Sequence, residues 1–144
     1  MAGTITGSLQ RIPVQQGRPQ LVEITLLCTA DVATHTFPST IINHLSGIIE
    51  YDLRGLKLNL VKAIPDPVTP ITAASELTVL DPYGVDLLGG KGLDFLSDTE
   101  KTWTFFGPLD YYIPVHITGD ITVNINGNLV DSAKCTLILE LIGN

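Results

Sequence analysis

The sequence has few of the residues that build helical proteins or bind nucleic acids. Only 7 of its 144 residues are Ala and 1 is Met, whereas Ile (15), Val (10) and Thr (16), which favour strands, are abundant. Lys and Arg number 8 against 15 Asp and Glu, and the net charge of -7 would repel a phosphate backbone. We therefore expect neither a helical bundle nor a nucleic-acid-binding protein.

Cysteines and long apolar runs are also scarce. Cys28 and Cys135 are the only two cysteines, too few for a disulfide framework and without the paired spacing of a zinc site. We interpret each as a small core residue, with a disulfide between them as the alternative. Neither an apolar window of about 18 residues nor a basic or apolar leader occurs. The sequence therefore predicts no membrane partner and synthesis in the cytoplasm.

Alternating apolar residues predict strands along most of the chain. Two segments have one apolar face each: Val22, Ile24, Leu26 and Cys28 in 20–31, where Leu21 and Leu27 are exceptions, and Cys135, Leu137, Leu139 and Leu141 near the end. Leu56, Leu58 and Leu60 alternate in the same way before the prolines at 65 and 67. A short strand over 76–80 leads into a type I turn over 81–84.

Three segments leave their structure open. Residues 3–12 suit a peripheral arm or an edge strand. Residues 40–49 fit a short helix about as well as a strand, and we favour the strand. In 111–126 we prefer one long strand bent at Gly119 over a hairpin with a loop at 118–120. Together these patterns predict an all-β fold: an antiparallel β-sandwich or barrel, jelly-roll-like, with an N-terminal arm over 1–19 and a single β domain over 20–144.

The residues that could carry chemistry do not form a known signature. His35, His44 and His116 lie in different predicted elements, outside any metal or nucleophile motif. Acidic residues crowd into 81–110, but their spacing matches no calcium loop. We expect a solvated or interface surface there, with a calcium site or an acid–base pair as alternatives. The sequence predicts no enzymatic activity and no cofactor.

A glycine-rich segment and an aromatic cluster follow one another in the chain. The segment 89–92 lacks both the Ser or Thr after the lysine and the earlier glycine of a phosphate-binding loop. We expect its glycines to allow a close backbone approach or a positive φ. Trp103, Phe105 and Phe106 suit an intersubunit plug, a sugar-stacking platform or an ordinary core cluster.

The segment GVDLLGGKGLDFL, the Trp-containing stretch after it, and the ending VHITGDITVNINGNLVDSAKCTLILELIGN resemble small β-rich virion proteins of tailed bacteriophages. The start, GTITGSLQRIPVQ, has the same character. Head decoration, or cement, proteins of this kind typically form trimers on the outside of the capsid. The resemblance implies a structural virion protein that is a homotrimer and contacts the major capsid protein. A tail or receptor-binding β-sandwich protein that contacts host glycan through the Trp103 region is the alternative.

The apolar content of the chain also indicates buried surface between subunits. Hydrophobic residues make up 44% of the sequence, and the mean hydropathy is +0.31, which is high for a single soluble subunit of this length. We expect these contacts between subunits to involve the N-terminal arm over 1–19 and the segment from Leu88 to the aromatic residues Trp103, Phe105 and Phe106. The candidate interface residues are Arg11, Arg18, Leu88, Leu93, Phe95, Trp103, Phe105 and Phe106.

Overall fold

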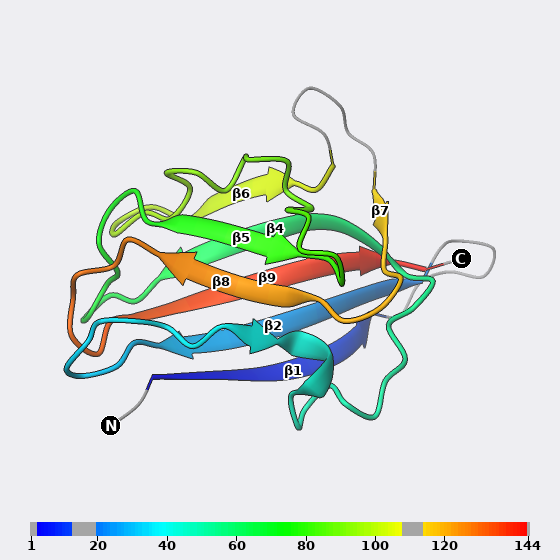
Figure 1. The fold of residues 1–144 in the computed structure, drawn as a ribbon, viewed down its shortest axis with the longest axis horizontal. Coiled ribbons are helices and arrows are strands. Elements are labelled where there is room, and N and C mark those ends of the chain that lie inside the picture. The colour runs from blue at the N-terminus through cyan, green and yellow to red at the C-terminus, as the bar shows by residue number, and fades with distance from the viewer. Residues whose placement is uncertain (1–2, 13–19, 108–113, 144) are drawn as a thin grey trace.

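The computed structural model describes residues 3–12, 20–107 and 114–143. Its strands form two antiparallel sheets (Figure 1). Sheet A contains, in spatial order, β1 (Thr4–Ile12), β2 (Leu21–Thr29), β9 (Lys134–Ile142), β4 (Lys57–Pro65) and β6 (Thr102–Phe105), and β7 (Val115–His116) also pairs with β4. Sheet B contains β3 (Thr40–Ile41), β8 (Thr122–Asn126) and β5 (Glu76–Leu80). The fold is therefore all-β, as predicted, and sheet A is open between β1 and β6 instead of closing into a barrel.

The core lies between the two sheets, which face one another in Figure 1. The alternation in β2 and β9 has the predicted phase: Val22, Ile24, Leu26, Cys28, Cys135, Leu137, Leu139 and Leu141 are all buried. Sheet B contributes Leu77, Val79, Val123 and Ile125 from β5 and β8. Because one face of each strand is apolar, burying that face against the other sheet removes it from water. The only helix among the described residues is a 3₁₀ turn, Ile42–His44, and no described helix is long and apolar enough to cross a bilayer.

A β-bulge in β4 changes which of its residues face the core. The pairing with β9 shifts between Leu58 and Leu60. Leu58 and Val61 are buried, whereas Leu60 lies on the opposite face and is only partly buried. The predicted shared face of Leu58 and Leu60 is therefore wrong, because the extra residue, Asn59, reverses the alternation after it. The strand does end at Pro65, as predicted.

Residues 4–12 form an edge strand, one of the two forms that the sequence left open. They pair with β2 along their whole length, from Thr4 opposite Thr29 to Ile12 opposite Leu21. The rest of the predicted arm, including Arg18, lies outside the described residues. A turn over 45–51 packs against this strand: a Cβ placed on Gly47 would lie 2.0 Å from the Gly7 carbonyl oxygen. Such a cover limits pairing of the sheet edge with another chain.

Two predicted strands are shorter than expected. In 40–49 only β3 is a strand, and a 3₁₀ turn and further turns follow it, so our preference for a strand is wrong for most of this segment. In the described part of 111–126, β7 belongs to sheet A and β8 to sheet B. Gly119 lies where the chain crosses between the sheets, with Ile117 and Ile121 buried on either side. The single long strand is therefore wrong, because its two halves pair with different sheets.

The segment 84–101 is a loop, as predicted, and it covers the free edge of β5. The Leu77 N–H donates to the Gly92 carbonyl (2.9 Å), and the Leu87 N–H donates to the Val79 carbonyl (2.7 Å). A Cβ placed on Gly92 would lie 1.7 Å from the Leu77 carbonyl oxygen, so only glycine fits there. The expected close backbone approach is confirmed at this glycine.

Candidate functional site: an open sheet face

Among the described residues, sheet B covers only one face of sheet A, and side chains on the opposite face are partly or largely exposed. We call this surface the open face. Its side chains are Thr4, Thr6, Ser8, Gln10 and Ile12 from β1, Leu21, Glu23, Thr25, Leu27 and Thr29 from β2, Lys134, Thr136, Ile138, Glu140 and Ile142 from β9, Lys57, Leu60, Lys62 and Ile64 from β4, and Trp103 and Phe105 from β6. Leu27 is 56% exposed and Trp103 is 61% exposed. An antiparallel sheet with one solvated face normally places polar residues there, so these apolar side chains call for an explanation.

The strand register arranges the open face in rows that run across the sheet. One row runs Trp103, Lys62, Ile138, Thr25, and the next row runs Phe105, Leu60, Glu140, Glu23. Trp103 and Phe105 are two residues apart on β6, so their rings point the same way. The ring centroids are 5.2 Å apart and the planes meet at 85°, an edge-to-face pair. An aromatic pair therefore forms one margin of the open face.

Charges of both signs lie on the open face. The Lys62 Nζ lies 4.0 Å from the Glu140 Oε2, and the Asn59 Nδ2 donates to the Glu140 Oε1 over 3.2 Å. Glu23 lies on β2 directly opposite Glu140. Lys57 lies on β4, opposite Ile142 of β9. Two carboxylates and three ammonium groups thus share the face, because Lys134 has the same strand phase as Glu140 on β9. Surface pairs of this kind determine which partners fit more than they add stability.

A hollow of about 260 Å³ lies at one end of the open face. It is lined by Leu27, Cys28, Thr29, Asp66, Lys134, Cys135 and Thr136. Cys28 and Cys135 are opposite one another on β2 and β9, and both are buried free thiols. The hydrogen bond with Cys135, together with burial, raises the pKa of the Cys28 thiol well above its usual value. A thiol held protonated is a poor nucleophile, which fits the predicted role as a core residue.

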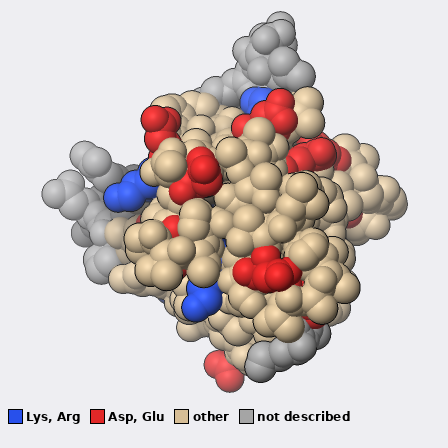
Figure 2. Space-filling model, turned by 90° about the vertical axis from the view of Figure 1, so that its left-hand side faces the viewer, with Lys and Arg blue, Asp and Glu red and all other residues tan. Residues whose placement is uncertain are grey.

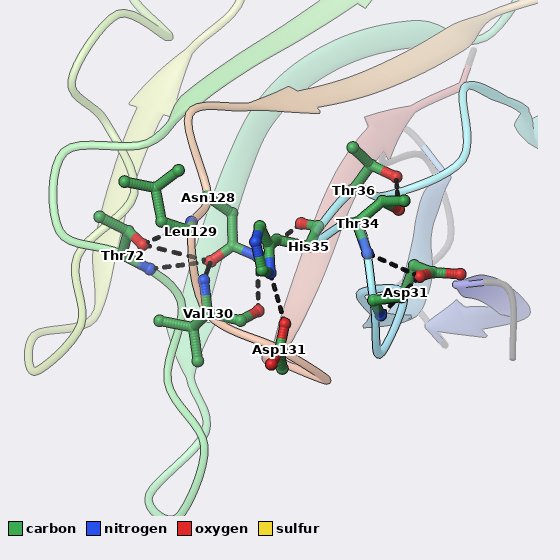
Figure 3. A network of polar contacts seen from close by, with 10 residues as sticks. Asp31, Thr34, His35, Thr36, Thr72, Asn128, Leu129, Val130 and Asp131 are labelled. Atoms are coloured by element: carbon green, nitrogen blue, oxygen red, sulfur yellow. Dashed lines mark hydrogen bonds and ion pairs between the residues drawn. The ribbon is translucent and has the colours of Figure 1, made fainter.

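The loops at this end of the molecule are held together by polar contacts (Figure 3). The Asn128 Oδ1 accepts the N–H groups of Thr72 (3.1 Å) and Val130 (3.2 Å), and its Nδ2 donates to the His35 carbonyl (2.7 Å). His35 also pairs with Asp131. Figure 2 shows this end of the molecule with separate acidic side chains on a mostly uncharged surface. Because Asn128 is itself almost fully buried, these bonds serve to hold the loops.

Two of the predicted acidic residues have structural roles. The Asp81 Oδ1 accepts the N–H groups of Tyr83 (2.8 Å) and Val85 (2.9 Å), which closes the predicted turn. Asp86 accepts the N–H of Leu88 and that of Gly90. Within the described residues, no three His, Cys, Asp or Glu side chains are arranged to hold a metal ion.

The structure separates the predicted interface residues into two groups. Leu88 and Phe106 have no exposed surface and pack in the core of the single chain, so their assignment to an interface is wrong. Leu88 lies in the loop over 84–101 and Phe106 directly follows β6, and a local pattern does not reveal that either is buried. Trp103 and Phe105 lie together on the open face.

The other candidates lie away from that face. Leu93 is exposed in the loop over 84–101, and Phe95 packs partly against the core. The Arg11 guanidinium lies 5.8 Å from the centre of the Tyr51 ring, at the opposite edge of the sheet. Ile138 is a site residue that the sequence analysis missed. It could have been recognised in the sequence because it is an apolar residue at a position of the strand where the alternation predicts a polar one.

The chain matches no protein-family model, no curated protein and no solved structure. The open face is therefore the feature from which a function is inferred.

Proposed function

We propose that the chain is a structural protein of a tailed-bacteriophage particle, without enzymatic activity, and that the open face of sheet A is an assembly surface. One observation carries this proposal: Leu27 and Trp103 are more than half exposed on a sheet face that no second layer of described strands covers. Large exposed apolar patches on soluble proteins mark sites of association. Aromatic residues are enriched at the centres of such contacts.

The proposal includes the expected architecture and partners. Sheets A and B would be the two layers of the β-sandwich that the sequence predicts. The chain would be made in the host cytoplasm and would bind copies of itself and the major capsid protein, as a head decoration protein does. Its stabilising effect on the head would come from buried apolar and polar surface.

The exposed Trp103 also supports a second candidate, a tail or receptor-binding protein. Trp103 is 61% exposed and makes an edge-to-face contact with Phe105, so the exposed part of its ring can stack on the apolar face of a sugar. In this case the ring would bind host glycan instead of a protein subunit.

Protein abundance in purified particles tests the two candidates. A decoration protein should approach the copy number of the major capsid protein, whereas a tail protein should be present at a small fraction of that number. Quantitative mass spectrometry of purified particles of the encoding virus measures the ratio. Absence of the chain from those particles would contradict both.

A further inference from the structure

We propose that two copies of the chain stack face to face through their open faces, about a two-fold axis that crosses the strands between the rows of Ile138 and Glu140. This inference deepens the proposed function, on which it rests for its role in a particle, because it identifies the contact between copies. It also specifies which residues meet across that contact.

The open face is large enough for a stable contact. Four of its strands have nine residues each, which corresponds to a length of about 30 Å at about 3.3 Å per residue. Five strands at about 4.8 Å spacing give a width of about 20 Å between the outermost strand axes. The resulting area of about 600 Å² is close to the roughly 800 Å² that each partner buries in a standard interface.

Two copies can stack face to face about a two-fold axis that runs either along β9 or across the strands. Repulsion between like charges excludes the first. In a closed pair of identical chains, the same surface of each copy meets the other. A two-fold axis along β9 would place Glu140 opposite Glu140 of the second copy, and two carboxylates would then meet in a contact that excludes water. A two-fold axis across the strands avoids this, because it exchanges each row with a different row.

The axis across the strands brings complementary side chains together. The register of the described strands places Trp103 opposite Phe105 of the second copy, and Leu27 opposite Leu21 of the second copy. Each copy supplies both members of each pair, so both pairs form twice. The strands of the two stacked sheets then run nearly antiparallel, which is compatible with aligned packing of twisted sheets.

The same axis also brings a lysine of the second copy close to Glu140. Glu140 of the second copy comes opposite Ile138, in the row that contains Lys62. Each Glu140 would then lie beside two lysines, Lys62 of its own chain and Lys62 of the other. A foreign basic partner would require a face with a clear negative excess, whereas here two carboxylates accompany three lysines, Lys57, Lys62 and Lys134. The charge pattern therefore favours a second copy.

Charge exchange between Lys62 and Glu140 tests this geometry. K62E and E140K should each be monomeric, because each variant places like charges across the contact. A mixture of the two should form a heterodimer, because the carboxylate introduced in K62E then faces the ammonium group introduced in E140K. In the other half of that contact, the unaltered Glu140 of the first variant faces the unaltered Lys62 of the second. Sedimentation velocity and native mass spectrometry of the separate and mixed proteins measure this. Two folded variants that do not associate when mixed would overturn the proposed axis.

A second variant keeps the test independent of the partly buried Asn59–Glu140 hydrogen bond. Leu27 is already exposed, so L27K should leave the fold intact while raising the dimer dissociation constant by about tenfold or more. E50K changes the net charge as E140K does, at an exposed residue outside the open face, and should dimerise like the unaltered chain. An unaltered chain that is monomeric at micromolar concentration, or that forms an odd-numbered oligomer, would overturn the inference. So would L27K that dimerises like E50K.

These outcomes separate this inference from the proposed function. A chain that dimerises through the open face but is absent from virus particles contradicts only the proposed function. A chain that is abundant in particles but monomeric in solution contradicts only the face-to-face contact.

Discussion

Glu23 and Glu140 lie directly opposite one another on β2 and β9, with both side chains on the open face. Like charges in this position repel, and in the single chain Lys62 lies near only the second of them, 4.0 Å from the Glu140 Oε2. The chain thus has an unfavourable pair at the centre of its most exposed sheet face. Natural proteins are rarely at their stability optimum, so a repulsive surface pair of this kind leaves room for a stabilising substitution.

Replacement of Glu23 should therefore stabilise the subunit. E23K converts a repulsive cross-strand pair into an attractive one, which should raise the free energy of unfolding by about 0.2–1 kcal/mol. E23Q should give a smaller gain, because it removes only the repulsion. Urea unfolding at one protein concentration, with the L27K background as the monomeric reference, measures both. An E23K chain less stable than E23Q at low salt would contradict this interpretation of the pair.

Adjacent residues on β9 should respond in opposite ways to the same substitution. Leu139 is fully buried between Ile24 and Val61, so L139D would bury an unpaired charge and should prevent folding or cost several kcal/mol. I138D places the same group on the open face and should leave the fold intact while weakening association. Circular dichroism and thermal unfolding compare the two. A folded, oligomeric L139D chain would show that the faces are assigned wrongly.

The close approach at Gly92 gives a prediction about the loop over 84–101. G92A should lower the free energy of unfolding by more than the approximately 1–2 kcal/mol that a non-glycine residue costs in the left-handed region. The reason is that a Cβ 1.7 Å from the Leu77 carbonyl oxygen forces the loop off β5. Gly84 has φ +82° and open space around it, so G84A supplies a control with backbone strain alone. Unfolding free energies, with hydrogen exchange at the Leu77 amide, distinguish the two. Equal losses would mean that the loop tolerates the shift.

Acid should destabilise the fold through the turn at Asp66. The N–H groups of Thr69 (2.8 Å) and Val68 (3.0 Å) donate to the Asp66 Oδ2 and lower the pKa of this carboxyl below its usual 3.8. Because the folded pKa is the lower one, the contribution is complete above pH 3.8 and is lost as the pH falls through the folded pKa. In D66N, the melting temperature should fall less than in the unaltered chain as the pH is lowered through that range. E50Q, at an exposed carboxyl in a different loop, is the control and should follow the unaltered chain.

The two cysteines should remain reduced and unreactive in the folded protein. Both are buried, and the raised pKa of Cys28 keeps its thiol protonated. Iodoacetamide should therefore label neither residue in native buffer and both in denaturant, as read by mass spectrometry. A native mass lower by two hydrogens would instead support the disulfide that the sequence left open.

Much of the strand pattern was predictable because it is local. The phase of β2 and β9 follows from a period of two, and turn chemistry placed the bend that Asp81 closes. An edge strand or arm over residues 3–12 was also a local prediction, based on its weak alternation and its glycines. None of these predictions needed knowledge of which strand lies next to which.

Part of the open face could also be found in this way. Leu27 stands out because it is apolar at the polar phase of its strand, and Trp103 because it is the only tryptophan. Their neighbours on the face could not be found, since Lys62 comes to Glu140 only through a pairing of strands far apart in the sequence.

The remaining features were decided by tertiary structure. The bulge at Asn59 turns Val61 inward, and the crossing at Gly119 divides one apolar pattern between two sheets. Leu88 is a core residue although it lies in the loop that covers the edge of β5, and Phe106 is a core residue directly after β6. Alternation identifies the apolar face of a strand, which is the face to be buried. Strand pairing, register and loop packing depend instead on contacts between residues that are distant in the sequence. Those contacts determine what each side is buried against, and which face is left open.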